Sequence, residues 1–385
     1  MDSRFAFDDP TCRALAEAHG TPSFAYSKAV AEAQFKALRA ALPYRARIAY
    51  AVKANPHPAL LRCFARLGAS FDCASIGELD RVEALDLPPG RTFFAGPGKR
   101  EAELVKALAL GVRVQAEGWE DLARLDALAT GEVAVNLRVH PAFDIDEGNR
   151  LIGGSGPSAF GVDEEEVPAL LARAASLRHV RIRGLHVFAA SNQRDAGKLL
   201  AIHGAVLDLA KRLQADHGLP MEQIDLGGGL GIAYAPGEAP LDLALFGQGL
   251  SNLLAAHPWF TGELILEPGR FLAGPCGVYL VRVVRIKASR GVRFAILEGG
   301  INHLIRPLLT GQPFPVKAVG KGEGDLAYTL AGPLCTSLDR LGDVVLPELA
   351  AGDLLALGRT GAYGLNEGMT HFLSHPVPPE AWVEG

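Results

Sequence analysis

The sequence lacks the features that mark several classes of protein. Its five cysteines form no CxxC pair and are odd in number, so we expect reduced thiols rather than a disulfide framework. The net charge is −5 and no basic run is present, which argues against nucleic acid and anionic membrane surfaces as partners. No stretch of about 20 apolar residues could span a bilayer, and the first residues lack the basic-then-apolar layout of a signal peptide. We therefore expect a cytoplasmic protein.

Metal-ligand spacing is also absent. Among the 11 histidines, His371 and His375 come closest to a ligand pair, but a proline follows them and no third ligand is evident. We therefore predict no metal site.

The sequence does contain a regular alternation of strand-like and helical segments from about residue 24 to residue 268. Apolar runs predict strands at Ile48–Val52, Ser70–Cys73, Thr92–Ala95, Arg113–Gln115, Val133–Val139, Ile182–Phe188, Gln223–Leu226 and Glu263–Leu266. Amphipathic patterns predict helices at Pro58–Leu67, Ile76–Ala84, Arg100–Leu110, Trp119–Ala129, Glu164–Ser176 and Lys198–His217. Eight such steps in about 245 residues favour an α/β fold, the (β/α)8 TIM barrel. An open doubly wound sheet is the alternative, which the lack of a GxGxxG after the first strand weakens.

The pattern changes after Arg270. Strand-like runs occur at Gly277–Lys287, Arg293–Leu297, Pro315–Val319 and Leu354–Leu357. Because long helices are scarce here, these runs predict an antiparallel β domain, to which the segment up to about Ala25 is expected to return. We thus predict a barrel domain at 24–268 and a C-terminal β domain at 269–385 together with 1–23.

Lys53 stands at the end of the first predicted barrel strand, where Asn55-Pro56 then breaks the chain. A lysine at the end of a buried strand is costly unless it is paired or used. Such a place can lower the pKa of the lysine and free its amine to attack a carbonyl group. The alternative is a lysine whose charged end reaches water. Lys53 is therefore a candidate Schiff-base lysine.

Two further segments stand where a barrel binds phosphate and cofactor. Gly227, Gly228 and Gly229 follow the seventh predicted strand, where backbone N–H groups can approach a phosphate closely. A tight structural turn is the alternative for this loop. Glu267 closes the eighth strand and could face the nitrogen of a pyridine ring, or instead pair with Arg270.

The predicted β domain supplies two more candidates. Cys335 follows a Gly-Pro step and precedes hydroxyl residues, so it could lie in a loop and give a proton to a carbanion. Otherwise it is a small buried hydrophobic residue. Tyr363 stands between glycines, where its hydroxyl could bind a phosphate oxygen or its ring could pack at a turn.

Together these segments closely resemble the fold-type III decarboxylases that use pyridoxal 5′-phosphate (PLP), the group of diaminopimelate and ornithine decarboxylases. The matching segments are Tyr50-Ala51-Val52-Lys53-Ala54-Asn55, Phe71-Asp72-Cys73-Ala74-Ser75, the glycines at 227–229, Glu267-Pro268-Gly269-Arg270, residues 299–307, Gly332-Pro333-Leu334-Cys335 and Gly361-Ala362-Tyr363-Gly364. The resemblance covers nearly the whole chain. It implies a PLP-binding TIM barrel followed by a C-terminal antiparallel β domain, the two-domain plan of alanine racemase.

The resemblance also implies roles for the matching positions. Lys53 would hold PLP as a Schiff base, and Cys335 would be the proton donor. The implied cofactor contacts are Lys53, Phe188, Ser191, Gly227, Gly228, Gly229, Glu267, Gly269, Arg270 and Tyr363. The implied substrate contacts are Arg270, Arg306 and Tyr363. Because the family's active sites form between two protomers, a homodimer is expected.

The chain departs from the family at positions that contact the ring or the substrate. Phe188 stands where many members carry a histidine stacked on PLP. Thr336 stands where diaminopimelate decarboxylases carry a glutamate after the cysteine, and Thr310 where they carry a tyrosine. A site that must pair a buried ammonium discriminates strongly when its carboxylate is missing. The sequence therefore predicts a substrate other than meso-diaminopimelate or a simple diamine precursor, with Thr336 and Asp339 as candidate substrate contacts.

Three segments are most similar to a biosynthetic-cluster subgroup of this family. They are Gly-Pro-Leu-Cys-Thr at 332–336, the loop at 153–157 before Phe160, and the segment at 371–376. The subgroup includes carrier-protein-linked glutamyl decarboxylases, exosortase-associated decarboxylases and siderophore-pathway decarboxylases. We therefore predict α-decarboxylation of an amino acid or an amino-acid conjugate in biosynthesis, with the substrate free or presented by a carrier protein.

Four alternatives stay open. The first is a diaminopimelate decarboxylase with altered substrate contacts. The second is an amino-acid racemase on the same fold, although the Gly-Pro-x-Cys motif favours decarboxylation. A non-enzymatic PLP carrier would resemble a barrel alone, and a catalytically dead regulator would have no need of Lys53, Glu267 and Cys335.

Overall fold

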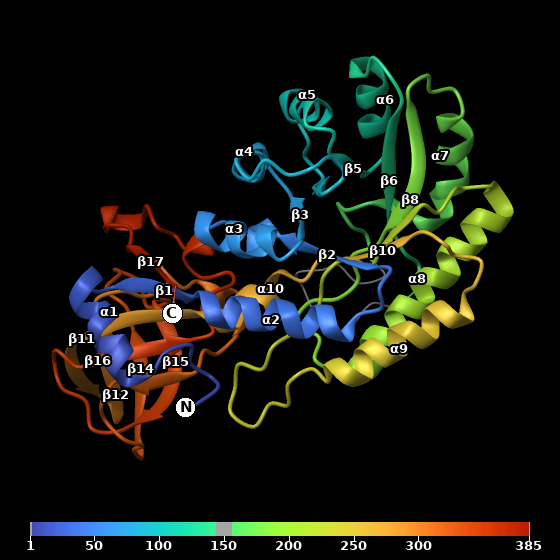
Figure 1. Cartoon of the computed structure of the whole chain (residues 1–385). Helices are drawn as coiled ribbons and strands as arrows, with labels where there is room; N and C mark the ends of the chain where they lie inside the picture. Colours follow the sequence, from blue (N-terminus) through green and yellow to red (C-terminus); the bar gives the residue numbers. More distant parts are fainter. Residues whose placement is uncertain (1, 144–155, 385) are drawn as a thin grey trace. The chain divides into compact units, whose positions relative to one another are not determined.

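The computed structural model describes residues 2–143 and 156–384 of the chain, so part of the predicted loop at 153–157 lies outside the described residues. The chain divides into two compact units (Figure 1). The barrel unit consists of Phe35–Gly231 and Pro240–Gly269, and the β unit of Met1–Gln34, Ile232–Ala239 and Arg270–Gly385. The predicted domain bounds stay a prediction; the compact units differ from them in residues 24–34 and 232–239, which group with the β unit.

The barrel unit is built on a closed parallel sheet. Within the described residues its strands are β2 (Ala46–Ala51), β3 (Ser70–Cys73), β4 (Thr92–Phe94), β5 (Arg113–Ala116), β6 (Val133–His140), β8 (Val180–His186), β9 (Gln223–Asp225) and β10 (Glu263–Leu266). Each pairs with the next in parallel, and β10 pairs back with β2. A short strand, β7 (Val162–Asp163), adds to β6. The predicted TIM barrel is confirmed, and each predicted strand end lies within two residues of the observed one.

Helices connect the barrel strands. They are α3 (Pro58–Arg66), α4 (Ile76–Glu83), α5 (Glu101–Ala109), α6 (Trp119–Leu128), α7 (Val167–Ala174), α8 (Ala196–His217) and α9 (Leu243–Ala256), while α2 (Lys28–Ala41) contains a boundary between the units. Local signals fix their ends: the Ser75 side chain caps α4, the Asp195 side chain caps α8, and Gly218 in the left-handed region ends α8.

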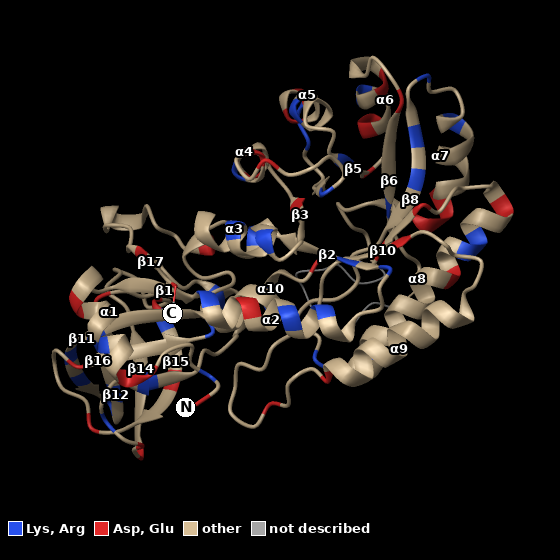
Figure 2. Ribbon diagram, in the orientation of Figure 1, with Lys and Arg blue, Asp and Glu red and all other residues tan. Residues whose placement is uncertain are grey.

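Helix α9 was missing from the predicted helices. Its sequence contains no charged residue, and Figure 2 shows it uncoloured beside the charged segments of α8. A helix without charges has no polar face that stands out in an amphipathic pattern. The side chain of Asp242 caps its first turn by accepting a hydrogen bond from the backbone N–H of Leu245 at 2.9 Å, and α9 packs against α8 (Figure 1).

The interior of the barrel contains a chain of polar side chains. Asn136 on β6 donates a hydrogen bond to Gln223 on β9 at 3.2 Å, and Gln223 donates to Glu263 on β10 at 3.0 Å. Glu263 in turn pairs with Arg47 on β2. Gly184 on β8 leaves the space for this chain, because a Cβ atom there would lie 2.5 Å from Oδ1 of Asn136. This chain of side chains runs from the buried amide of Asn136, whose Oδ1 has no hydrogen-bond partner among the described residues, to the partly exposed pair of Glu263 and Arg47.

The β unit contains a mixed sheet. Within the described residues its strands are β1 (Ser23–Ser27), β11 (Gly277–Ser289), β12 (Val292–Leu297), β13 (Val316–Ala318), β14 (Leu326–Ala331), β15 (Arg340–Leu346), β16 (Leu354–Gly358) and β17 (Glu380–Val383). The pairs β1–β11, β11–β12, β11–β16, β13–β16 and β14–β15 are antiparallel, as predicted, whereas β12–β14 and β1–β17 are parallel. The unit also holds α1 (Asp9–His19), α11 (Arg306–Thr310) and all but the first residue of α10 (Gly269–Ala273).

The N-terminal segment belongs to the core of the β unit. Strand β1 pairs with β11 on one side and with β17 on the other. Phe7 and Cys12, which precede it, share one apolar cluster with Val278 and Leu280 of β11. Strand β1 thus joins the sheet of the β unit, while the predicted bounds of the N-terminal segment stay a prediction.

Among residues 2–143 and 156–384, every helix is too short or too polar to cross a membrane.

His203 should make the stability of the barrel unit depend on pH. It is buried on α8 beside Phe246 of α9, and burial lowers its pKa from 6.5 to about 4. Because the folded pKa lies below the unfolded one, the unfolded chain takes up the proton first, and stability falls as pH drops from 6.5 toward 4. Replacing His203 with Leu should remove about 2 kcal/mol of the stability difference between pH 7 and pH 4.5 in urea unfolding.

The matched control for this prediction is His19→Leu, which removes an exposed histidine near the end of α1. If the His203 and His19 variants show the same dependence of unfolding free energy on pH as the wild type, the assignment to His203 is wrong.

Candidate active site

Lys53 lies just beyond β2, in the 3-10 turn at Val52–Ala54, rather than on the strand itself. Its Nζ atom is 2.6 Å from Oδ2 of Asp72 on β3. The Lys53 side chain is 38% exposed, whereas that of Asp72 is 1% exposed. Burial and the nearby Glu267 raise the pKa of Asp72, against the opposing effect of Lys53. The amine is thus held in place by a buried acid and remains reachable from the cavity.

A buried cluster lies at the carboxyl ends of β8, β9 and β10. His186, Asp225 and Glu267 each offer an atom within 4.8 Å of the others, and Nε2 of His186 is 3.7 Å from Oε2 of Glu267. Burial would raise the pKa of Glu267, but His186 and Lys53 lower it to about 2. Burial and the charge of Glu267 raise the pKa of Asp225 well above its usual range. The pKa shifts of Glu267 and Asp225 therefore run in opposite directions, and the two oxygens of Asp225 accept hydrogen bonds from Gln115 and from the N–H of Gly227, each at 2.9 Å.

Several atoms of this cluster have unused hydrogen-bonding capacity. Oε1 of Glu267 and both ring nitrogens of His186 have no hydrogen-bond partner within the described part of the chain. The three residues could in principle hold a metal ion, which the sequence did not suggest because they are far apart along the chain. An ionised, partly unsatisfied carboxylate also suits a protonated ring nitrogen.

The glycine loop after β9 packs closely against Phe188 and Glu267. Gly227 and Gly229 have φ values of 68° and 104°, and a Cβ atom at Gly228 would lie 2.8 Å from the carbonyl oxygen of Glu267 and 3.3 Å from the Phe188 ring. The N–H groups of Gly228 and Gly229 donate to no protein acceptor among the described residues. Free N–H groups on a loop without side chains form an anion-binding surface.

The cavity beside the cluster has a volume of about 280 Å³. Phe188 and Phe160 are its aromatic walls, and Lys53 and Glu267 both line it. Arg138 also lines it: Nη1 is 2.7 Å from Oε1 of the Glu117 carboxylate, and the guanidinium carbon is 4.7 Å from the Phe160 ring centroid. The cavity thus brings together the amine, the acid and the aromatic residue that the sequence predicted for one site.

Sequence reasoning gave no role to several residues of this cavity, notably Asp72, His186, Asp225, Arg138 and Phe160. Two of them carry a signal that could have been used. Asp72 is the one charged residue of the buried strand β3, and Asp225 ends the buried strand β9. A carboxylate on a strand that is otherwise buried needs a partner or a function.

The other predicted cofactor contacts of the barrel unit lie in loops next to the cavity-lining segments. Ser191 follows β8 by five residues and is half-buried. Gly269 follows β10, and a Cβ atom there would lie 2.7 Å from Cβ of Ala54, so the loop packs directly against the turn that carries Lys53.

Arg270, Arg306 and Tyr363 form a second cluster, within the β unit. The guanidinium carbons of the two arginines lie 4.8 and 4.3 Å from the Tyr363 ring centroid. Nε of Arg306 is 2.9 Å from Oε2 of Glu367. Tyr363 has a φ of 53°, an uncommon conformation for a bulky residue and one that is often associated with function. The three predicted substrate contacts are therefore neighbours inside their own unit.

The loop between β14 and β15 carries the remaining candidates. Cys335 is exposed and Thr336 is half-buried. Asp339 is buried, and its two oxygens accept hydrogen bonds from the backbone N–H groups of Ile301 and Leu334, both at 2.8 Å. This geometry argues against the predicted substrate contact of Asp339, because both oxygens already hold the backbone of the loop. The spacing between Cys335 and Asp339 in the sequence did not indicate in which direction the Asp339 side chain points.

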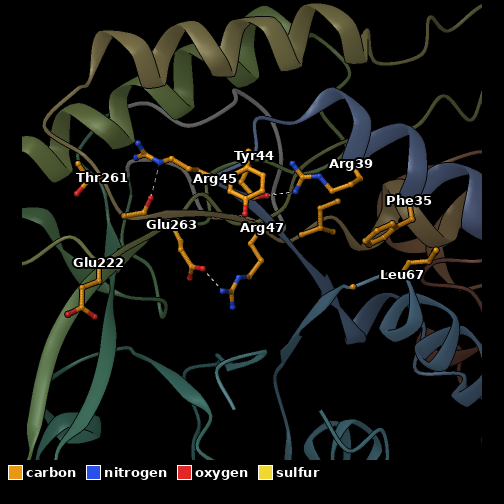
Figure 3. A pocket seen from close by; sticks show the side chains of 13 residues that line it. Phe35, Arg39, Tyr44, Arg45, Arg47, Leu67, Glu222, Thr261 and Glu263 are labelled. Atoms are coloured by element: carbon orange, nitrogen blue, oxygen red, sulfur yellow. Dashed lines mark hydrogen bonds and ion pairs between the residues drawn. The ribbon is translucent and has the colours of Figure 1, made fainter. Parts of the chain in front are cut away.

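A second pocket lies at the amino ends of β2 and β10 (Figure 3). Arg47 pairs with Glu263 there, and Arg39 and Arg45 donate to backbone carbonyl groups. The charge of Arg47 is paired, whereas the partners of Arg39 and Arg45 are neutral carbonyl groups that hold the backbone at this end of the barrel. Polar residues at this end of a TIM barrel generally serve stability, whereas catalysis takes place at the carboxyl ends of the strands.

Comparison with known proteins decides the family. The family model described as "Pyridoxal-dependent decarboxylase, pyridoxal binding domain" matches residues 28–274. The chain belongs to the pyridoxal-dependent decarboxylases. The predicted family, its PLP cofactor and its carboxy-lyase activity on an amino acid are thereby confirmed, whereas the predicted biosynthetic-cluster subgroup stays a prediction.

The relatives of this decarboxylase bear two kinds of substrate name. It is 36% identical over 356 residues to the diaminopimelate decarboxylase of Pseudomonas aeruginosa, covering 91% of this chain and 85% of that protein. It is 31% identical over 392 aligned positions to the L-glutamyl-(BtrI acyl-carrier protein) decarboxylase of Niallia circulans, covering 97% of this chain and 91% of that protein. The solved diaminopimelate decarboxylase of Helicobacter pylori in complex with L-lysine gives a TM-score of 0.88 at 27% identity, covering 97% and 94%. Diaminopimelate decarboxylases predominate among these relatives.

The residues of the barrel cavity and the glycine loop beside it fit PLP. An amine at the cavity wall, an ionised Glu267 with an unpartnered oxygen, and a glycine loop with free N–H groups next to Phe188 and Glu267 match the aldehyde, the ring nitrogen and the phosphate.

Gly228→Ala should weaken PLP binding to the apoprotein on the order of tenfold, because the new methyl group would displace the loop from the carbonyl of Glu267. An absorbance titration of the apoprotein with PLP measures the effect. Gly131→Ala is the control, since no heavy atom lies within 4 Å of the position of its Cβ. Equal PLP affinity in both variants would show that the loop does not hold the cofactor.

Proposed function

We propose that this decarboxylase removes the α-carboxylate of an amino acid whose side chain has no distal ammonium group, either free or tethered to a carrier protein. The observation that carries this proposal is Thr336 directly after Cys335, where an enzyme for a diamino acid needs a carboxylate. Asp339, the acid that could have replaced it, is committed to two backbone N–H groups. A substrate with a distal ammonium would therefore leave that charge without a partner in this loop.

The residues of the barrel cavity supply the groups that such a reaction requires. Lys53 would hold PLP through its ε-amine, with Asp72 fixing the position of that amine. When bound, PLP supplies an electron sink for the pair left behind by carbon dioxide. Glu267, whose pKa is lowered to about 2, would stay ionised and keep a proton on the ring nitrogen. Phe188 would cover the ring, and the glycines at 227–229 would hold the phosphate.

Cys335 would donate the proton that replaces the carboxylate at the α-carbon. Its thiol is exposed, which supports a role toward a group outside its own loop. We propose a homodimer in which this thiol serves the site of the second protomer, with Arg270, Arg306 and Tyr363 as substrate contacts. The cluster of two arginines and one paired glutamate supports an uncharged or anionic substrate side chain.

A second candidate is decarboxylation of meso-diaminopimelate through altered contacts, which the names of most relatives favour. Carbon dioxide release by the PLP-loaded enzyme separates the two candidates when it is measured with L-glutamate, a glutamyl carrier-protein conjugate, L-lysine, L-ornithine and meso-diaminopimelate. A higher kcat/KM for meso-diaminopimelate than for every substrate that lacks a distal ammonium would overturn the proposal.

Lys53→Ala should abolish carbon dioxide release and the covalent attachment of PLP, because no other amine would replace the one that Asp72 positions. Borohydride reduction followed by peptide mapping locates the attachment site. Lys211→Ala, which removes an exposed lysine of α8, is the control and should keep full activity. Full activity in the Lys53 variant would refute its assigned role.

Thr336→Glu should raise kcat/KM for meso-diaminopimelate on the order of tenfold, because it restores a carboxylate beside Cys335 for the distal ammonium. Thr336→Gln has nearly the same shape without the charge and should give no such gain. Steady-state kinetics on both variants measures the difference. An equal response of the two variants would show that charge at position 336 does not select the substrate.

A further inference from the structure

Arg270 is a buried cation without an acidic partner. It is 6% exposed, and its Nη1 atom donates to the hydroxyl of Tyr234 and to Oε1 of Gln312, each at 3.0 Å. Both partners are neutral. Among the described residues no carboxylate forms an ion pair with Arg270, since Glu367 pairs with Arg306 instead. A buried charge of this kind is costly until an anion neutralises it.

Gln312 has one amide orientation that this contact allows. A guanidinium group only donates hydrogen bonds, so the amide must turn its oxygen toward Arg270. Its nitrogen Nε2 then faces away from Arg270, and it is buried without a hydrogen-bond partner in the described part of the chain. Two unmet requirements therefore lie side by side: a positive charge that lacks an anion and an N–H donor that lacks an acceptor.

The turn that presents Gln312 depends on a residue in which this chain departs from its family. Thr310 ends α11, and its hydroxyl donates to the carbonyl oxygen of Arg306 at 3.0 Å while accepting from the N–H of Gln312 at 3.3 Å. A tyrosine carries its hydroxyl at the far end of the ring, away from its own backbone. At position 310 it therefore could not make these two contacts. The departure at Thr310 and the placement of Gln312 are thus linked by hydrogen bonds.

We propose that Gln312 and Arg270 together bind an oxyanion and that Gln312 is a specificity-determining residue of this decarboxylase. Arg270 supplies the charge, and Nε2 of Gln312 supplies a directed donor that only an acceptor oxygen can satisfy. The oxygen belongs either to a carboxylate of the substrate or to the phosphate of PLP. The inference rests on the proposed function, which it deepens: an ammonium group placed here would meet a guanidinium and an N–H donor, and would be rejected.

Two substitutions of Gln312 separate the contact from its support of Arg270. Gln312→Glu keeps an oxygen for Arg270 but replaces the N–H donor with a second, negatively charged oxygen. Gln312→Leu removes both groups. Tyr234→Phe removes the other neutral partner of Arg270 and leaves the amide intact. Gln248→Leu, on the exposed face of α9, is the control for the same chemical change.

Isothermal titration calorimetry with the PLP-loaded enzyme measures the affinity for glutarate and for cadaverine, two five-carbon probes of opposite charge. We expect the Glu variant to bind glutarate on the order of tenfold more weakly and to bind cadaverine more tightly than the wild type. If instead the affinity of the apoprotein for PLP falls in both Gln312 variants and glutarate binding stays unchanged, the oxygen belongs to PLP and the role of Gln312 in substrate specificity is overturned.

The inference is overturned if PLP and glutarate affinities of both Gln312 variants stay within about twofold of the wild type. It is also overturned if Tyr234→Phe reproduces the whole loss seen in Gln312→Leu, since Gln312 would then act only through Arg270. Failure of the proposed function is distinguishable, because it concerns which amino acid releases carbon dioxide and these binding measurements require no turnover.

Discussion

The site depends on one constraint: charged side chains are buried away from water at the carboxyl ends of the barrel strands. Asp72, Asp225 and Glu267 are almost fully buried. Among the described residues, Lys53 pairs with Asp72, His186 lies beside Glu267, and Gln115 and the N–H of Gly227 donate to Asp225. In such surroundings neighbouring charges shift the pKa of each acid. A histidine and a lysine lower the pKa of Glu267, and the charge of Glu267 in turn raises the pKa of Asp225. One barrel thus shifts the pKa values of two neighbouring carboxylic acids in opposite directions.

The sequence allowed prediction of the barrel because parallel strands buried on both faces are continuous apolar runs. Glu263–Leu266 contains such a run, Leu264-Ile265-Leu266, and the structure has the strand at the same bounds. Helix α9 was missed because it contains no charge to define a polar face. Strands β14 and β15 were missed because their exposed and buried residues follow no regular alternation. The order in which the strands of the β unit pair depends on contacts between residues far apart in the sequence, which local sequence patterns do not reveal.

The site residues that the sequence allowed us to predict are those that directly follow a strand. Lys53, Glu267 and the glycines at 227–229 all follow strands, and parallel strands bring their carboxyl ends to one rim. The partners of these residues could not be predicted in the same way, because the pairing of Lys53 with Asp72 depends on which strands are neighbours. Asp339 shows the converse. It stands four residues after Cys335, but this position does not reveal that its carboxylate turns inward and accepts hydrogen bonds from backbone N–H groups.

Gly184 is enclosed both by a side chain and by the backbone of a neighbouring strand. A Cβ atom there would lie 2.5 Å from Oδ1 of Asn136 and closer still to the carbonyl oxygen of Gln223. Because the second contact is with backbone, shortening the side chain at position 136 would not make room for a side chain at position 184. A designer who wishes to change the interior of this barrel therefore has to leave position 184 as glycine and vary the residues around it.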